Sequence, residues 1–450
     1  MMPNMRVIPK VLRRSIVPLA ALVMAACLSA GVGSPISPGT PVPTPGAPVP
    51  TVGPIGVPVS PSSLSPSSDS PSPVSPSPHP GEHLDQTPWG RTIDRLIGAR
   101  QISVAVRVGP TLTYAHLADT RRAPASNEKL LLSMTALGEL GPDYRIPTDA
   151  AVEPGTLHSG VVHGDLWIVG HGDPEFDDAA VRALGAKIRA AGVRRITGSV
   201  LGDTAGFVRD RHAPGWHRMA LDNVGLPTAL SFDHNVGPSG FVLIPELKAA
   251  QALTAALRTD GVMVGSSARA AAASGSLHRV ATVRSAPLAD ILRRQNITSD
   301  NTAAETLSKV LGAQFGGEGS IAAGALVIHA WLHDHGVGGR VLDASGLSYR
   351  DRISPLALTR LLTLALHRPW GSLLRASLPQ PGQGTLGDRL TGIAVRAKTG
   401  TLTQGISALS GFIRLRSGRT AVFSILSQGL VKDTAVRIED AIVRTVASKA

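Results

Sequence analysis

The stretch Ser126-Asn-Glu-Lys-Leu-Leu-Leu-Ser-Met-Thr-Ala-Leu137 predicts an amphipathic helix that begins at a serine. Leu130, Met134 and Leu137 share one face at helical spacing, and a glycine follows. The hydroxyl of Ser126 is expected at the positive end of the helix dipole. Lys129 lies one turn further on and faces the same way, because residues i and i+3 are neighbours on a helix.

A lysine held beside a serine in a dry cleft can act as its base. Desolvation and nearby cations lower the pKa of an amine, so that Lys129 would take the proton of Ser126 and leave a nucleophilic oxygen. An isolated Ser-x-x-Lys pattern is more often a helix-capping serine with a solvated lysine. The catalytic hypothesis therefore needs further residues.

A second polar motif, Ser299-Asp300-Asn301, lies between two helical patterns. Ser299 is a candidate to relay a proton to a leaving group, and Asn301 is a candidate to hold a substrate amide. The structural alternative is a helix start, with Ser299 or Asp300 as the cap of a helix at 302.

A third motif, Lys398-Thr399-Gly400, ends a predicted strand and is followed by Thr401. A cation and a hydroxyl at this point could bind a carboxylate. Gly400 has no side chain, so an extended peptide could lie close to the strand edge. The backbone N–H groups of Ser126 and Thr401 would then form an oxyanion hole. The structural alternative is an ordinary strand end with a surface lysine.

Hydrophobic patterning around these motifs predicts an α+β fold. A sheet that combines N-terminal and C-terminal strands, covered by helices, is the economical arrangement, and 142–285 would be an excursion from it. That excursion looks mostly β, with short alternating runs at 161–169, 195–201, 239–244 and 278–283. Elsewhere we expect strands at 102–108, 111–116, 393–398, 407–415 and 419–427, and helices at 286–294, 302–313 and 433–447.

The three motifs, in this order, resemble the set of the penicillin-binding proteins and serine β-lactamases. Ser126 and Ser299 are 173 residues apart, a spacing that resembles the D-alanyl-D-alanine carboxypeptidases of peptidase family S13, which are low-molecular-mass class C penicillin-binding proteins with an extra domain inserted there. Further stretches similar to that branch are Gly170-His-Gly-Asp-Pro174, Gly202-Asp-Thr-Ala-Gly-Phe207, Ala213-Pro-Gly-Trp216, Asp343-Ala-Ser-Gly-Leu-Ser348 and Val395-Arg-Ala-Lys-Thr-Gly-Thr-Leu402.

The resemblance covers roughly 90–450 and implies a transpeptidase-like domain, an antiparallel sheet with helices, that carries an inserted β-rich domain. It implies a serine-type D-Ala-D-Ala carboxypeptidase that acts on peptidoglycan stem peptides through an acyl-enzyme on Ser126 and binds β-lactams. DD-endopeptidase or transpeptidase action would use the same acyl-enzyme. A serine β-lactamase and a non-catalytic wall-binding protein on this fold are the alternatives.

One departure from the family concerns the pocket for the peptide side chain. Relatives usually place an arginine directly after the Ser-Gly-Leu-Ser stretch, whereas here Tyr349 stands there and Arg350 follows. Arg350 is kept as a candidate for substrate binding, together with Asp203, which matches an acidic position of the inserted domain. Thr399, Gly400 and Thr401 complete the substrate-binding candidates.

Composition limits the chemistry further. Cys27 is the single cysteine of the 450 residues, so an internal disulfide and a cysteine-based metal site are excluded. We expect neither a metal nor another cofactor. The formal charge of +12 suits an anionic partner such as an acidic wall polymer. Aromatic residues are only 3% of the sequence, which argues against a platform for stacking nucleic-acid bases. We therefore expect no nucleic acid among the partners.

The N-terminal region predicts export. A basic segment at 6–14 precedes the uncharged stretch 15–33, which is typical of a signal peptide or an N-terminal membrane anchor covering 1–33. Cleavage, retention as an anchor, and lipidation at Cys27 remain open. Residues 34–84 predict a Pro/Ser-rich disordered linker, because 34–81 hold sixteen of the 35 prolines. The catalytic domain would comprise 85–141 and 286–450, facing the outer side of the cytoplasmic membrane, the periplasm or the cell wall.

Overall fold

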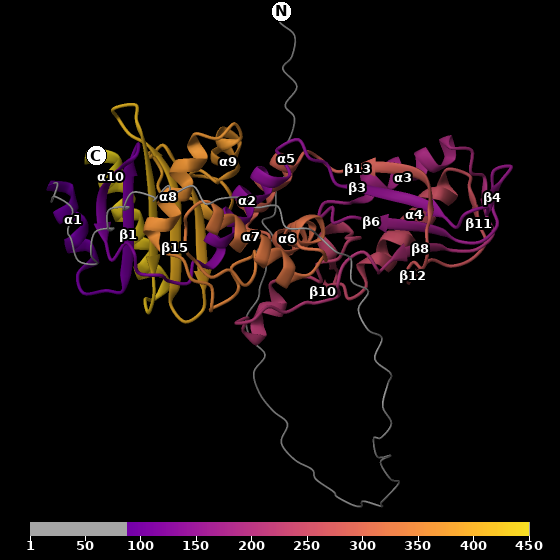
Figure 1. The fold of residues 1–450 in the computed structure, drawn as a ribbon, viewed down its shortest axis with the longest axis horizontal. Coiled ribbons are helices and arrows are strands. Elements are labelled where there is room, and N and C mark those ends of the chain that lie inside the picture. The colour runs from indigo at the N-terminus through magenta and orange to yellow at the C-terminus, as the bar shows by residue number, and fades with distance from the viewer. Residues whose placement is uncertain (1–87, 450) are drawn as a thin grey trace, which may run out of the picture. The chain divides into compact units, whose positions relative to one another are not determined.

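The computed structural model describes residues 88–449, and strands from both ends of this range form one antiparallel sheet (Figure 1). The strand order is β14-β15-β16-β1-β2, and the first strand pairs with the last from Ile102 opposite Ser427 to Val108 opposite Ala421. This confirms the sheet of N- and C-terminal strands. Its members are β1 (Ile102–Val108), β2 (Thr111–His116), β14 (Val395–Leu402), β15 (Ile406–Arg414) and β16 (Thr420–Ser427).

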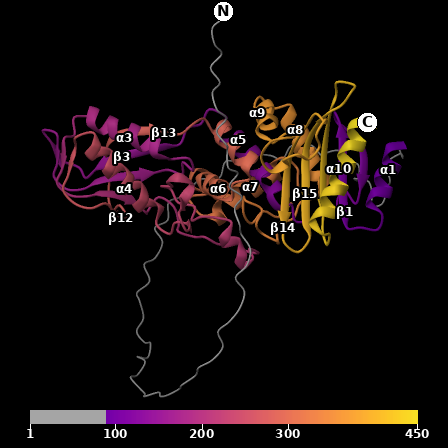
Figure 2. The same cartoon turned by 180° about the vertical axis from the view of Figure 1, so that it is seen from behind.

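Helices cover both faces of this sheet. Residues alternate between the faces of a strand, so Leu409 and Ile413 pack with α1 (Pro88–Ile97) and α10 (Lys432–Lys449), which lie beside each other (Figure 2). Ala408 and Phe412 pack in the core of the other face. That face is covered by α2 (Glu128–Glu139), α5 (Leu288–Thr298), α6 (Asn301–Phe315), α7 (Ile321–Asp334), α8 (Pro355–Leu366) and α9 (Gly371–Ser377).

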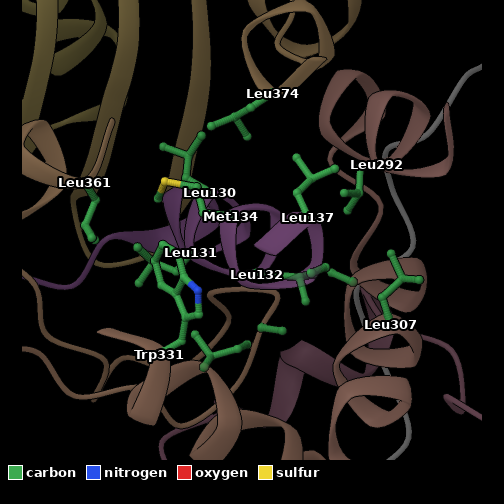
Figure 3. Close-up of a cluster of buried hydrophobic side chains, with 14 of the residues drawn as sticks. Leu130, Leu131, Leu132, Met134, Leu137, Leu292, Leu307, Trp331, Leu361 and Leu374 are labelled. Atoms are coloured by element: carbon green, nitrogen blue, oxygen red, sulfur yellow. The ribbon is translucent and has the colours of Figure 1, made fainter. Parts of the chain in front are cut away.

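Helix α2 is enclosed by its neighbours on every side. Each of its residues from Glu128 to Leu137 is buried, and Figure 3 shows its leucines in contact with side chains of the surrounding helices, among them Trp331 and Leu374. A helix that is apolar around most of its circumference belongs in a protein interior. The helix therefore fixes any side chain at its N-terminus within the densest part of the fold.

The segment 142–285 leaves and re-enters the main body at the same place, because its first and last strands pair with each other. β3 (Pro147–Val152) and β13 (His278–Arg284) form an antiparallel edge of a sheet with the order β12-β8-β6-β3-β13. A second sheet has the order β11-β7-β5-β4, and β9 pairs with β10. These strands are β4 (Leu157–His158), β5 (Val161–Val162), β6 (Leu166–Gly170), β7 (Arg195–Ile196), β8 (Val200–Asp203), β9 (Val236–Gly237), β10 (Gly240–Phe241), β11 (Met263–Val264) and β12 (Arg269–Ala271).

The expectation of a mostly β segment is wrong in two places, where long helices stand. In α3 (Asp178–Ala190) the side chain of Asp177 accepts from the N–H of Ala180 as an N-cap. In α4 (Pro245–Thr259) a proline occupies the first turn, where its missing N–H costs nothing. The capping aspartate and the first-turn proline are both present in the sequence. The alternation of apolar and polar residues in the short runs beside them favoured strands instead. The expected strand 239–244 is reduced to β10.

Part of this segment packs against the main body. Phe207 and Ala229 join the core around α2, and Trp216 and Val224 form a small cluster with Ile321 of α7. The stretch 207–229, to which Phe207, Ala229, Trp216 and Val224 belong, contains the 3₁₀ helix η2 (Arg218–Asp222). A second 3₁₀ helix, η3 (Asp233–Asn235), follows it. Residues 207–229 therefore reach the helices beside the first two motifs, as do Glu175 and His234, which form ion pairs with Arg294 of α5 and with Asp300.

None of the helices within 88–449 combines the length and apolar character needed to cross a bilayer. Over the same residues no group of three or more His, Cys, Asp or Glu side chains is arranged to hold a metal ion. The predicted leader 1–33 and linker 34–84 lie outside the described residues.

Candidate active site

The amine of Lys129 connects the first two motifs. Its Nζ lies 3.1 Å from Oγ of Ser126 and 2.7 Å from Oδ1 of Asn301, and it donates to the backbone carbonyl of Ser345 at 2.5 Å. Ser126 belongs to the 3₁₀ turn η1 (Ala125–Asn127) that leads into α2, and no side-chain capping bond forms at this helix start. The structure thus contradicts the alternative of a capping serine with a solvated lysine.

Burial prepares Lys129 to act as a base. The side chain is fully buried, and loss of hydration lowers the pKa of its amine to about 8, although Asp343, Glu305, Asp300 and Glu128 oppose the shift by their charge. A neutral amine has two N–H donors and one lone pair. With Asn301 and Ser345 accepting the two donors, the lone pair is left for the hydroxyl of Ser126.

The third motif meets the second through its lysine. Nζ of Lys398, on β14, donates to Oγ of Ser299 at 2.9 Å and to the carbonyl of Thr399 at 3.0 Å. Burial, followed by the charge of Lys129, lowers the pKa of Lys398 well below its ordinary value. Two lysines and two serines therefore converge, with each lysine within hydrogen-bond distance of one serine.

Asp300 in the middle of the second motif has the structural role considered for it. Its carboxylate accepts from the N–H of Ala303 as the N-cap of α6, and it forms an ion pair with His234 at 3.4 Å. Burial alone would raise the pKa of Asp300, but the bonds to His234 and Ala303 outweigh it and lower the pKa. Ser299 does not cap the helix. It ends α5 in the left-handed region at φ 60°, which releases its hydroxyl toward Lys398.

The strand β14 passes directly beside the nucleophile. A Cβ on Gly400 would lie 2.9 Å from the carbonyl oxygen of Pro124 and 3.0 Å from the backbone nitrogen of Ser126. From the other side, a Cβ on Gly346 would lie 1.9 Å from the carbonyl oxygen of Ala125. Ala125 itself has φ 47°, a costly value for a residue with a side chain. Because Gly346 and Gly400 have no side chain, the loop at 342–348 and the strand β14 can both pack against the turn that carries Ser126.

The loop at 342–348 contacts Lys129 through the backbone carbonyl of Ser345. The sequence analysis assigned no chemistry to this loop. The carboxylate of Asp343 accepts from the N–H groups of Gly346 at 2.7 Å and Ser348 at 2.8 Å. Glu305 of α6 accepts from the N–H groups of Ala344 at 3.1 Å and Ser345 at 2.7 Å. Two buried carboxylates therefore fix the backbone whose carbonyl receives the bond from Lys129.

Four acidic side chains form a buried group around this loop. Burial and the negative charge of Asp343 raise the pKa of Glu305 to about 7, and the same two causes raise the pKa values of Glu128 and Asp351 well above their usual range. All four residues are 1% exposed or less. Protonation of some members lets them remain in one place without full mutual repulsion.

The stretch 213–223 adds three hydrogen bonds to this arrangement. The indole N–H of Trp216 donates to Asp343 at 2.5 Å, and the hydroxyl of Ser348 donates to the carbonyl of Pro214 at 2.8 Å. The side-chain amide of Asn301 donates to the carbonyl of Asn223 at 2.9 Å. The two family-like stretches around Trp216 and Asp343 therefore meet. Their resemblance to the family was the available signal, but their contact was not predictable from it.

The side chains of Thr399 and Arg350 make their contacts away from the two lysines, although the backbone carbonyl of Thr399 accepts from Lys398. Thr399 donates to the hydroxyl of Thr385 at 2.7 Å, and the phenol of Tyr349 is hydrogen-bonded to Thr403 just beyond the third motif. Arg350 is exposed, and its side chain touches the position where Gly215 would carry a Cβ.

Asp203 is not brought to the motifs by any contact among the described residues. It is buried on β8, where its carboxylate accepts from the N–H groups of Ala205 at 2.9 Å and Ala273 at 3.0 Å.

Comparison with known proteins gives a consistent result from residue 98 to residue 449. A family model described as the D-Ala-D-Ala carboxypeptidase 3 (S13) family matches residues 98–236 and 235–449. The D-alanyl-D-alanine carboxypeptidase of Actinomadura sp. (strain R39) is 28% identical over 409 residues, covering 71% of this chain and 76% of that protein. Carboxypeptidase DacB of Mycolicibacterium smegmatis is 29% identical over 341 residues, covering 68% of this chain and 71% of its own.

Among solved structures, penicillin binding protein 4 (dacB) from Haemophilus influenzae matches with a TM-score of 0.69 at 18% identity, over 81% of this chain and 100% of that one. The same protein complexed with a β-lactam matches with a TM-score of 0.63 at 19% identity, over 79% and 99%. At this identity the likeness shows the fold, and it confirms the predicted α+β class of the penicillin-binding proteins.

Proposed function

Because the chain belongs to the D-Ala-D-Ala carboxypeptidase 3 (S13) family, we propose that it is a serine-type D-Ala-D-Ala carboxypeptidase that acts on peptidoglycan stem peptides and is acylated by β-lactams. One observation carries the proposal: Nζ of Lys129 lies 3.1 Å from Oγ of Ser126 while its other contacts occupy both remaining donors. A non-catalytic wall-binding protein would have no need to keep a buried amine beside a serine.

Acylation follows from the positions of the two lysines. Neutral Lys129 takes the proton of Ser126, whose Oγ attacks the carbonyl carbon of the penultimate D-alanine. The N–H groups of Ser126 and Thr401 receive the negative charge of the carbonyl oxygen. Lys398 and Thr399 bind the terminal carboxylate, and Ser299 passes a proton to the departing amine.

The second half-reaction completes hydrolysis. Water attacks the ester on Ser126, releases the shortened peptide and restores the hydroxyl. If the amine of a second peptide attacks instead, the product is a cross-link. If the acyl-enzyme forms from a cross-link, the result is endopeptidase action. Asn301, which bonds both Lys129 and Asn223, lies where it can hold a substrate amide in each case.

The domain layout is part of the proposal. The catalytic domain comprises 85–141 and 286–450, and 142–285 is an inserted domain. Support comes from the pairing of β3 with β13 at its two ends and from a hydrophobic cluster composed only of residues between Ala150 and Val283. A membrane anchor or signal peptide at 1–33 and a spacer at 34–84 would place the domain outside the cytoplasmic membrane, where its substrate is found.

Fluorescent penicillin and a peptide substrate test the function together. Wild-type protein should be labelled and should release D-alanine from a stem pentapeptide, while Ser126→Ala should do neither. We expect the label to persist, as in a peptidase and unlike a β-lactamase, which clears its acyl group rapidly. Fast turnover of penicillin without release of D-alanine from any peptide would favour the β-lactamase.

A further inference from the structure

Two side chains of the segment 142–285 contact the helices that flank the second motif. Glu175 binds the guanidinium of Arg294 on α5 through both of its carboxylate oxygens, in a paired geometry. Nδ1 of His234 lies 3.4 Å from Oδ2 of Asp300, the cap of α6. The helix before the motif and the helix after it are therefore both tied to this segment.

The loops that carry Glu175 and His234 belong to one packed unit. The N–H of Asp233 donates to the carbonyl of Phe176 at 3.0 Å, and the rings of Phe176 and Phe232 meet edge to face with their centroids 6.4 Å apart. Both phenylalanines are buried in the hydrophobic cluster of the segment. Glu175 and His234 are thus anchored to the core of 142–285.

His234 projects from a turn whose backbone has an unfavourable conformation. Asp233, His234 and Asn235 have φ values of 49°, 53° and 57°, all in the left-handed region, which is costly for residues with a side chain. The buried side chain of Asn235 stabilises the turn, because its Oδ1 accepts from the N–H of Phe232 at 2.9 Å and its Nδ2 donates to the carbonyl of Leu226 at 2.8 Å. A strained turn that is fixed in this way keeps His234 directed at the cap of α6.

Carboxylates predominate around the imidazole of His234. The charged groups that face it line a pocket of about 570 Å³ and are Asp300, Glu175, Asp177, Asp233 and Arg294. The hydrogen bond to Asp300 raises the pKa of His234 most, and the charges of Asp300, Glu175 and Asp233 add to it, although burial opposes the shift. The cationic form of His234 is therefore more favoured than that of a free imidazole.

Resting on the proposed function, we propose that His234 in its cationic form is a positioning residue for acylation, which holds Asp300 so that the serine and the asparagine of the second motif stay in contact with the two lysines. Asp300 stands between Ser299 and Asn301 in the chain, so a shift of its carboxylate moves both neighbours. Because the pKa of His234 is raised in the folded protein, the ionic part of its contact is complete below the ordinary histidine pKa and is lost as pH rises through the raised value. The segment 142–285 thereby acts on the reaction through the second motif.

The first test compares wild type with His234→Asn in the full-length protein. Asparagine adopts the left-handed region more readily than most residues, so the turn should be kept while the cation is lost. At pH 6 the variant should be acylated by penicillin about three- to fivefold more slowly, the size expected for a half-exposed ion pair. At pH 9, where His234 of wild type has lost its proton, the two rates should lie within about 1.5-fold of each other.

A double-mutant cycle tests whether the effect passes through Asp300. Asp300→Asn removes the charge and keeps a side chain that can cap α6. In this background His234→Asn should change the rate at pH 6 by less than about 1.5-fold, because the contact is already lost. His234→Lys carries a cation at both pH values, so it should be acylated faster than His234→Asn at pH 6 and at pH 9.

A histidine NMR titration gives a readout that does not depend on activity. The signal of His234, assigned by its absence in His234→Asn, should titrate at a higher pH in wild type than in Asp300→Asn. His278→Asn is the matched control, because His278 is an exposed histidine on β13 of the same segment. It should be acylated like wild type at pH 6 and at pH 9.

Three results would overturn the proposal. An equal loss in His234→Asn at pH 6 and pH 9 would show a structural effect of the turn, and no loss at either pH would show that the contact does not position the motif. A loss that persists in the Asp300→Asn background would mean that the charge of His234 acts on Lys129 through space. Failure of the proposed function is distinct, since wild type would then not be acylated at any pH, while His234 would still titrate above its ordinary pKa.

Discussion

Lys129 donates a 2.5 Å hydrogen bond to the backbone carbonyl of Ser345, a residue 216 positions further along the chain. This bond joins the first motif to a loop that Asp343 and Glu305 hold through four backbone N–H groups. The geometry of the proposed base thus depends on residues that do not face the nucleophile. The amine is aimed at Ser126 because the loop and Asn301 fix its other two contacts.

Replacing Lys129 by alanine should lower the rate of penicillin acylation about 10²–10⁴-fold, the usual effect of losing a general base. Release of D-alanine from a pentapeptide should fall in parallel. Lys432→Ala, at the exposed start of α10, is the matched control and should behave as wild type. Acylation of the Lys129 variant at a near-normal rate would assign the base to another group.

The acylation rate should depend on pH through the lowered pKa of Lys129. Only the neutral amine accepts a proton, and its pKa is about 8. The rate constant should therefore rise about tenfold per pH unit between pH 6 and 7 and level off above about pH 8. Stopped-flow measurement with a chromogenic β-lactam checks this. A flat profile from pH 6 to 8 would show that the base titrates lower.

Asp343→Asn should affect both the rate and its pH profile. The carboxylate accepts from Gly346 on one oxygen and from Ser348 and Trp216 on the other, whereas an amide has only one accepting oxygen. The loop that bonds Lys129 should therefore loosen, and the plateau rate should fall. Asp343 also raises the pKa of Lys129 by its charge, so its removal should move the acidic limb to lower pH. Asp334→Asn, exposed at the end of α7, is the control. A lower plateau with no shift in pH would limit Asp343 to a structural role.

Gly400→Ala should slow acylation by at least about tenfold without unfolding the protein. The added Cβ meets backbone atoms of Pro124 and Ser126 at 2.9 and 3.0 Å, and such atoms cannot rotate away. β14 must then move from the nucleophile, and about 1 Å of misplacement is enough for a large loss of rate. Gly185→Ala is the control, because its Cβ would have only ordinary contacts on α3. Normal acylation in the Gly400 variant would show that the strand can shift freely.

Lys309→Met should destabilise the protein by about 3 kcal/mol, because the backbone carbonyls that accept from the amine lose their donor at about 1–3 kcal/mol for each buried one. Nζ of this fully buried lysine on α6 donates to the carbonyls of Val208, Asp210 and Pro227 and pairs with the carboxylate of Asp210. These bonds hold the stretch that carries Asn223 against Asn301. Urea unfolding measures the effect, with Lys432→Met as the exposed control. A loss below about 1 kcal/mol would mean that water replaces the amine.

The sequence alone predicts the sheet and the chemistry of the three motifs. The strands at 102–108 and 111–116 match β1 and β2 because alternation of apolar residues and a Gly-Pro turn are local signals. The pairing of N- and C-terminal strands also follows, since each needs a partner in a sheet covered by helices. Ser126, Lys129, Ser299, Asn301 and Lys398 were identifiable because each motif is contiguous in the chain.

Only the tertiary structure decided how these residues act on one another. Whether Lys129 is a base depends on its burial and on carboxylates contributed by α6 and by the loop at 342–348, none of which is local in sequence. The use of Asp203 for backbone contacts on β8 likewise depends on which elements pack together. Desolvation and charge act through space, and chain distance carries no information about either.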